Sequence, residues 1–297
     1  MNVLSVPALL PGDWPTVQIL DVGAMPEGEA RYRPLLDSGL AFVTGFEPQA
    51  DQLAKLRAAP GPYRWLPHIL GDGRPGTFHV TRYPGCSSLL EPDPAVIDLF
   101  HRISAGRSGG NFFVVERRPV QTVRLDDVPE RPRPDHVKID VQGAALMVLE
   151  HATESLRDTL VIEVEAEFIP LYKNQPLFGD LQSFLGRQGF LFHKFVDICG
   201  RAFVPMAPPN PAAAVSQALW ADAIFVRDFT RLDGFSHEQL RKAALILHEV
   251  YRSYDLALRF LTELDRRSGD DLGRRYHEAL LKQGALPRHF MTVRENL

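Results

Sequence analysis

Acidic residues end four apolar runs of this sequence, and carboxylates at such positions can bind hydroxyl groups or remove protons. Asp21 lies in VQILDV, Glu47 ends LAFVTGFE, Asp72 ends WLPHILGD, and Asp140 follows HVKI. Ligands of open α/β sheets bind outside the carboxyl ends of the strands. If these runs are neighbouring strands, the four carboxylates should face one site. The alternative is that each acid caps a helix or stays solvated at a strand end.

The stretch from Asp135 to Ala152 indicates how Asp140 is positioned. Residues 136–141 alternate apolar and polar side chains and are rich in β-branched residues, which favours a strand. Gly143 allows the chain to turn after the strand, and apolar residues then recur at helical spacing up to Ala152. Lys138 lies on the same strand face as Asp140, so it is a candidate electrostatic partner or, alternatively, a structural ion pair.

Similar runs predict strands and helices that alternate along most of the chain, which is typical of an α/β sheet. Proline and glycine mark several of the boundaries, as expected for turns. The expected strands are 17–22, 40–47, 65–72, 136–141, 160–165, 190–196 and 220–229, and the expected helices are 29–38, 49–59, 145–152 and 176–188.

Two regions depart from this alternation. Residues 73–127 contain three short strand patterns, at 77–83, 112–118 and 120–125, and are predicted to be an insertion that covers the site. After residue 232 the sequence is helical, with a capping box at Ser236 and Gln239, a helical stripe from Leu240 to Leu261 and a further helix at 271–281. We therefore expect a domain at 1–232 and a helical extension at 233–297, which packs on its own domain or forms a homodimer.

Composition limits the possible functions. A net charge of −4 and the absence of a long Lys/Arg block do not favour nucleic acid or an anionic membrane surface. Cys86 and Cys199 have no metal-ligand spacing, and no apolar run approaches the ~20 residues of a membrane-spanning helix. The first residues lack the basic segment of a signal peptide. We expect a cytoplasmic protein that has no metal and acts on a small molecule.

The turn after the first expected strand favours one class of cofactor. It contains Gly23 but not GxGxxG, so a pyrophosphate-binding loop for NAD is poorly supported. Glu47 ends the second strand, where an acid can accept hydrogen bonds from both ribose hydroxyls. A nucleoside without a diphosphate, such as S-adenosylmethionine, fits better, with Asp21 and Gly23 at the turn and Asp72 toward the adenine.

Six segments resemble the FkbM family of S-adenosylmethionine-dependent O-methyltransferases, in the same order. They are ILDVGA (19–24), GFEP (45–48), LGDG (70–73), VRLDDV (123–128), VKIDVQGAALMVLE (137–150) and PLYKNQPLF (170–178). The resemblance covers residues 16–229. It implies the Rossmann-like, seven-stranded sheet of class I methyltransferases, with the seventh strand inserted antiparallel, and methylation of a hydroxyl on a sugar, polyketide or related metabolite.

The sequence also departs from the family pattern. Gln142 and Ala145 replace two acids of the common VEGAE motif. This loss weakens a metal site, because hard cations require several oxygen ligands, and it leaves Asp140 as the candidate base, with Lys138 beside it. The candidate residues for the pocket of the hydroxylated acceptor are Tyr83, Ser87, Ser88, Tyr172 and Gln175.

Two other functions remain open on the sequence. A catalytically degenerate methyltransferase fold could act as a binding module, because Gln142 and Ala145 are unusual for the family. An NAD-dependent oxidoreductase is disfavoured by the single glycine at the first turn and by the terminal strand WADAIFVRDF.

Overall fold

The computed structural model describes residues 5–24, 30–129, 131, 133–210 and 215–284. The chain divides into two compact units. One unit comprises residues 18–28 and 43–228, and the other comprises residues 1–17, 29–42 and 229–297. Among the described residues, no helix combines the length and the apolar character needed to cross a membrane.

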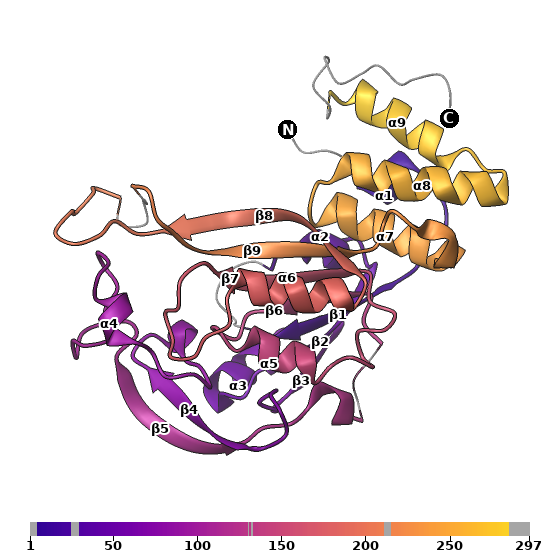
Figure 1. Cartoon of the computed structure of the whole chain (residues 1–297). Coiled ribbons are helices and arrows are strands. Elements are labelled where there is room, and N and C mark those ends of the chain that lie inside the picture. Colours follow the sequence, from indigo (N-terminus) through magenta and orange to yellow (C-terminus); the bar gives the residue numbers. More distant parts are fainter. Residues whose placement is uncertain (1–4, 25–29, 130, 132, 211–214, 285–297) are drawn as a thin grey trace. The chain divides into compact units, whose positions relative to one another are not determined.

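A seven-stranded sheet is the centre of the fold, with the strand order β3-β2-β1-β6-β7-β9-β8 (Figure 1). The pairs β1–β6, β2–β3 and β6–β7 are parallel, whereas β9 pairs antiparallel with both β7 and β8. The expected antiparallel seventh strand is therefore confirmed. The strands are β1 (Val17–Val22), β2 (Ala41–Phe46), β3 (Tyr63–Leu66), β6 (His136–Ile139), β7 (Val161–Glu167), β8 (Phe190–Gly200) and β9 (Ala218–Arg227).

One face of this sheet packs against helices. Alternate apolar residues of the central strands, such as Val137 and Ile139 of β6, join a buried cluster with Val148 and Leu149 of α5 and Leu185 of α6. The polar residues between them point to the opposite face because side chains alternate along a strand. The helices of this unit include α3 (Ala50–Ala58), α5 (Ala145–Glu150) and α6 (Phe178–Arg187).

The segment predicted as an insertion forms a separate two-stranded antiparallel sheet (Figure 1). The two strands expected at 112–118 and 120–125 are one continuous strand. Pro119 does not interrupt it, because each strand of a two-stranded sheet has a free edge where a missing N–H costs no hydrogen bond. The elements are β4 (Pro75–Thr81), η1 (Pro84–Cys86), α4 (Pro94–Ile97), β5 (Val114–Gln121) and η2 (Leu125–Asp127).

The third strand of the large sheet lies earlier than expected. Residues 65–72 were predicted, but β3 is Tyr63–Leu66 and ends before Pro67, which has no N–H to donate to a ladder. Beyond it, Leu70 forms only an isolated bridge with Val123. Asp72 therefore follows an irregular segment and does not end a strand of the sheet.

The second unit is helical. Ser236 and Gln239 form the predicted capping box at the start of α7. The apolar stripe expected to run to Leu261 is broken between α7 and α8, where Arg252 has a φ of 51°. The described helices are α1 (Val6–Leu9), α2 (Arg33–Asp37), η3 (Leu232–Gly234), α7 (His237–Glu249), α8 (Tyr254–Ser268) and α9 (Leu272–Lys282).

Candidate active site

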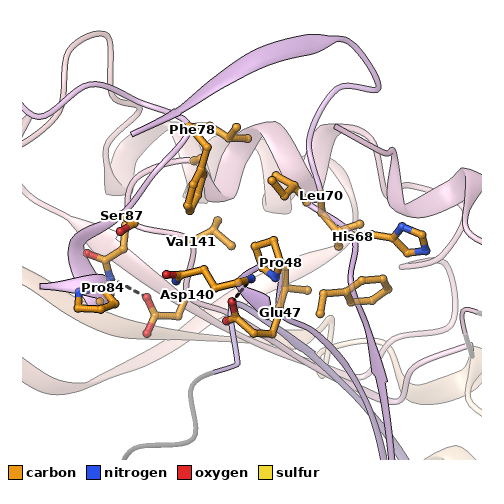
Figure 2. Close-up of a pocket in the computed structure, with 18 residues that line it drawn as sticks. Glu47, Pro48, His68, Leu70, Phe78, Pro84, Ser87, Asp140 and Val141 are labelled. Carbon is orange, nitrogen blue, oxygen red and sulfur yellow. Dashed lines mark hydrogen bonds between the residues drawn. The ribbon is translucent and has the colours of Figure 1, made fainter. Parts of the chain in front are cut away.

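A pocket opens where β1, β2 and β6 end. Figure 2 shows Glu47 and Asp140 on one side of this first pocket, with Phe78 of β4 pointing in from the opposite side. Phe46 and Leu70 add apolar surface. Apolar walls with a few convergent polar groups are typical of a small-molecule site.

Gly23 allows the three strand ends to approach one another. Its φ is +81°, and a Cβ at this position would lie 1.9 Å from the carbonyl oxygen of Asp140. Its N–H donates to the carbonyl oxygen of Phe46 at 3.1 Å. A side chain here would therefore both strain the backbone and separate β1 from β6.

Glu47 is a buried acid in the wall of the first pocket. Only 2% of the residue is exposed, and its carboxylate accepts a hydrogen bond from the N–H of Gln49 at 2.6 Å. Burial raises the pKa of Glu47 to about 7, against the lowering effect of that hydrogen bond, and the charge of Asp21 adds to the increase. A buried carboxylate in this state gains from hydrogen-bond donors supplied by a ligand.

Asp140 has a side chain that is 40% exposed and lines the same pocket. Its Oδ1 accepts a hydrogen bond from Nε2 of Gln142 at 2.8 Å, and the same amide nitrogen donates to Oε2 of Glu165 at 2.7 Å. Gln142 has a φ of 51°. The amide thus donates to both carboxyl groups, and it fixes the orientation of Asp140.

Lys138 and Asp21 lie beside the pocket but are not among the residues that line it. The Nζ of Lys138 is 3.5 Å from Oδ1 of Asp21 and 3.9 Å from Oδ2 of Asp140. Burial disfavours the ammonium, but the carboxylates of Asp21, Asp140 and Glu163 outweigh it and raise the pKa of Lys138. Lys138 therefore stays charged beside the pocket, and its role as an electrostatic partner of Asp140 stays a prediction.

Asp72 is separate from the first pocket. Its carboxylate accepts hydrogen bonds from the N–H of Arg74 at 2.9 Å and from the hydroxyl of Thr122 at 3.2 Å. The backbone hydrogen bond, although partly opposed by burial, lowers the pKa of Asp72. These hydrogen bonds are typical of an acid that caps a turn, and the contact of Asp72 with a cofactor stays a prediction.

The five residues predicted for the acceptor pocket divide into three groups. Ser87 lines the first pocket, whereas Tyr83 and Tyr172 line a neighbouring one. Ser88 and Gln175 are buried and line neither of these pockets; Ser88 donates to the carbonyl oxygen of Gln142 at 2.6 Å. Their roles in acceptor binding stay predictions.

Sequence reasoning missed two acids of β7. Glu165 and Glu167 lie near Asp140, and burial raises the pKa of Glu165 well above its usual value and that of Glu167 to about 8. The sequence VIEVEAE (161–167) indicates these acids, because an acidic residue recurs at every second position. In a buried strand this spacing places all three acids, Glu163 included, on one face. Within the described ranges, no group of three His, Cys, Asp or Glu residues has the geometry of a metal site.

The sequence from residue 21 to residue 192, more than half of the chain, matches the family model described as the methyltransferase FkbM domain. The chain belongs to the FkbM methyltransferase family. The predicted family and the methyltransferase class are therefore confirmed, and the oxidoreductase alternative has no support. Membership of this methyltransferase family implies the use of S-adenosylmethionine. No curated protein sequence matches the chain significantly.

Solved structures with a similar fold are distant from this FkbM protein. Magnesium protoporphyrin IX methyltransferase from Synechocystis PCC 6803, with bound SAM, is 13% identical; the match covers 75% of this chain and 76% of that chain with a TM-score of 0.38. Methyltransferase FkbM from Methylobacillus flagellatus KT is also 13% identical, with 75% and 48% coverage and a TM-score of 0.40. The TehB-like SAM-dependent methyltransferase from Corynebacterium glutamicum ATCC 13032 Kitasato is 12% identical, with 76% and 89% coverage and a TM-score of 0.35.

Proposed function

We propose that this protein methylates a hydroxyl group of a small metabolite, with S-adenosylmethionine held in the first pocket. The observation that carries the proposal is the pairing of a buried acid, Glu47, with a half-exposed acid, Asp140, in one pocket at the strand ends of a family methyltransferase sheet. The cofactor, when bound, supplies an electrophilic methyl group on a sulfonium.

The lining of the pocket fits an adenosine group. Glu47 can accept hydrogen bonds from two ribose hydroxyls, as its position after β2 suggests. Phe46, Leu70 and Phe78 offer apolar contacts for a flat base. Gly23 keeps the turn after β1 free of a side chain, so backbone can approach the ligand.

Asp140 is the proposed proton acceptor. As the acceptor oxygen bonds to the methyl carbon, the carbon–sulfur electron pair stays with sulfur and the hydroxyl proton leaves; Asp140 is the exposed carboxylate that can take it. Gln142 fixes Oδ1 of Asp140, and Lys138 lies 3.9 Å from Oδ2. These two contacts fix the orientation of the carboxylate in the pocket wall.

Asp140→Asn tests this function in the full chain with labelled S-adenosylmethionine and a pool of hydroxylated metabolites. The wild type should label an oxygen of at least one of them. The variant should keep its melting temperature and its affinity for S-adenosylhomocysteine, because the amide is nearly isosteric, and it should lose ~10²-fold or more in turnover. Wild-type turnover in the variant would remove Asp140 from the mechanism.

The matched control is Asp158→Asn, at an exposed acid whose partner is Arg133. This change should leave turnover unaltered. If the wild type binds S-adenosylhomocysteine but labels no hydroxyl compound, the protein is a binding module and the proposed reaction is wrong.

A further inference from the structure

Two segments that are far apart in the sequence form a short antiparallel ribbon beside α4 (Figure 1). Phe100, which lies shortly after α4, forms an isolated bridge with Phe203 of the connection between β8 and β9. Next to this bridge, the N–H of Val204 donates to the carbonyl oxygen of Leu99 at 2.9 Å. We call these two segments the apolar ribbon, which comprises residues 99–101 and 202–206.

The apolar ribbon exposes large apolar side chains on both of its faces. Because side chains alternate along a strand, Leu99 and Val204 lie on one face and Phe203 lies on the other. Phe203 covers the buried ring of Phe100, with 4.6 Å between the ring centres, but 45% of it stays exposed. Leu99, Val204 and Met206 are 48%, 49% and 56% exposed. Another folded protein would cover one face of such a ribbon, whereas lipid surrounds a segment that inserts into it.

The sequence of this region lacks the charges that are typical of a surface loop. Residues 202–221 include no charged residue, although 24% of the whole chain is charged. Pro205, Pro208 and Pro209 have no N–H, so fewer backbone donors would have to leave water in an apolar phase, where an unsatisfied donor is costly. The N–H groups of Val204 and Met206 already donate to carbonyl oxygens within the ribbon. The segment is therefore suited to an apolar phase.

Two arginines lie at the end of the ribbon that joins β8. Arg201 immediately precedes one segment and Arg102 immediately follows the other, so both flank the same end of the antiparallel pair. Long cationic side chains in such positions can reach lipid phosphates while the apolar residues enter the acyl chains. The acid that adjoins the ribbon, Asp98, already accepts hydrogen bonds from the N–H groups of Ala105 and Gly106, at 2.8 and 3.2 Å. Its charge is thus stabilised within the protein.

We propose that the apolar ribbon inserts into the boundary between the headgroups and the acyl chains of a lipid bilayer, with Arg102 and Arg201 at the depth of the phosphates. The protein then binds a membrane surface reversibly and does not span it. The scarcity of Lys/Arg blocks in the sequence argues against strong electrostatic attraction to lipid, but this surface binds through its apolar area. The proposal does not depend on the proposed methyl transfer.

Flotation of the full chain with unilamellar vesicles of phosphatidylcholine and a minor share of phosphatidylglycerol tests the proposal. The exposed apolar side chains are few, so we expect a modest binding constant of ~10³–10⁴ M⁻¹, similar to that of a single lipid chain. Val204→Asp should lower this constant tenfold or more, because a charge would have to enter the apolar phase. Arg102→Gln should lower it about fivefold on these vesicles and have little effect on phosphatidylcholine alone.

Val115→Asp is the matched control, at a valine of β5 that is 54% exposed and lies outside the ribbon. It should bind vesicles as the wild type does, and both valine variants should keep the melting temperature of the wild type. Met206→Asp should reproduce the loss seen with Val204→Asp, so a folding defect in one variant leaves the test intact.

Three results of the flotation experiment would overturn the proposal: no binding by the wild type, unchanged binding by the two ribbon variants, or an equal loss in Val115→Asp. Sedimentation equilibrium identifies the other possible occupant of the surface. A wild-type dimer that Val204→Asp dissociates, without flotation of the wild type, would show that the ribbon contacts a second copy of the chain and that the proposed lipid contact is wrong.

Discussion

At the scale of single residues, two acids of the first pocket are suited to different tasks by their surroundings. Glu47 is almost fully buried and has a pKa raised to about 7, whereas Asp140 exposes 40% of its side chain and is held by Gln142. A buried acid gains most from donors of a bound ligand. An exposed and oriented carboxylate can meet an incoming hydroxyl. In the proposed reaction, these surroundings suit Glu47 to ligand binding and Asp140 to proton transfer.

Glu47→Ala should lower the affinity for S-adenosylhomocysteine by ~1.5–3 kcal/mol, because two ribose hydroxyls would lose a charge-assisted acceptor. Isothermal calorimetry at pH 8, where most of the wild-type carboxyl is ionised, measures the change. Unaltered affinity in a folded variant would place the ribose elsewhere.

Asp72→Ala is the matched control for that experiment. The sequence suggested that Asp72 contacts the cofactor, but its carboxylate is used by Arg74 and Thr122 and does not line the pocket. We expect its removal to leave the affinity for S-adenosylhomocysteine unchanged. An equal loss in both variants would mean that the site extends to this turn.

At the scale of elements, the site depends on how closely the turn after β1 approaches the end of β6. Gly23 and Gly39 both have positive φ, but a Cβ on Gly23 would lie 1.9 Å from a carbonyl oxygen, whereas a Cβ on Gly39 would meet nothing within 4 Å. Alanine substitutions at these two glycines therefore distinguish the cost of backbone strain alone from the cost of strain together with a steric clash.

Gly39→Ala should cost only the left-handed strain, about 1–2 kcal/mol of the free energy of unfolding. Gly23→Ala should lower the free energy of unfolding by more than about 4 kcal/mol, because the forced separation of β1 from β6 is added to the backbone strain. Urea unfolding measures both, and S-adenosylhomocysteine binding should be lost only in the second variant. Similar costs at the two positions would show that the turn can open without harm.

Helices and strands whose residues have a strong local pattern could be predicted from the sequence. Strands whose bounds depend on which strands pair with them could not. The apolar run VQILDV correctly predicted β1, and the alternation that begins with HVKI correctly predicted β6. The apolar run that was predicted as a strand at 65–72 is stopped by Pro67, and Pro119 is accepted within β5 because that strand has a free edge. Local propensity does not reveal which edge is free.

The candidate site was predictable only in part, for a related reason. Glu47 and Asp140 end strands that are neighbours of β1, so the acids meet as the pattern suggested. Glu165 and Glu167 became visible only when β7 was placed beside β6, because their nearness to Asp140 depends on that pairing. The bridging role of Gln142 depends on a left-handed φ that an ordinary residue rarely adopts.

At the scale of the whole molecule, several buried carboxyl groups have raised pKa values. They include Glu47 at about 7 and Glu167 at about 8, with Glu165 and Glu249 raised in the same direction, all by burial. A raised folded pKa means that the folded state binds the proton more tightly than the unfolded chain, where the value is near 4.5. The stability from these groups is complete below pH 4.5 and is lost as pH rises through their folded values.

The free energy of unfolding should therefore fall between pH 5 and pH 8.5, by up to about 1.4 kcal/mol per pH unit for each titrating group. Denaturant unfolding at several pH values measures this slope. Glu167→Gln removes one of the groups and should make the slope shallower. The exposed control Glu116→Gln should not, and a slope that is equal in all three proteins would contradict the assignment.

The helical unit joins residues from the two ends of the described chain. The N–H of Val6 donates to the carboxylate of Glu249 at 2.6 Å across 243 positions, and Arg241 donates to the carbonyl oxygen of Asp13. During synthesis at ~5–20 residues per second, α1 therefore leaves the ribosome roughly 12–50 s before its partner helix exists. Its apolar residues therefore lack this partner until α7 has been synthesised. A ribosome stalled before α7 would carry a nascent chain in which α1 lacks this partner.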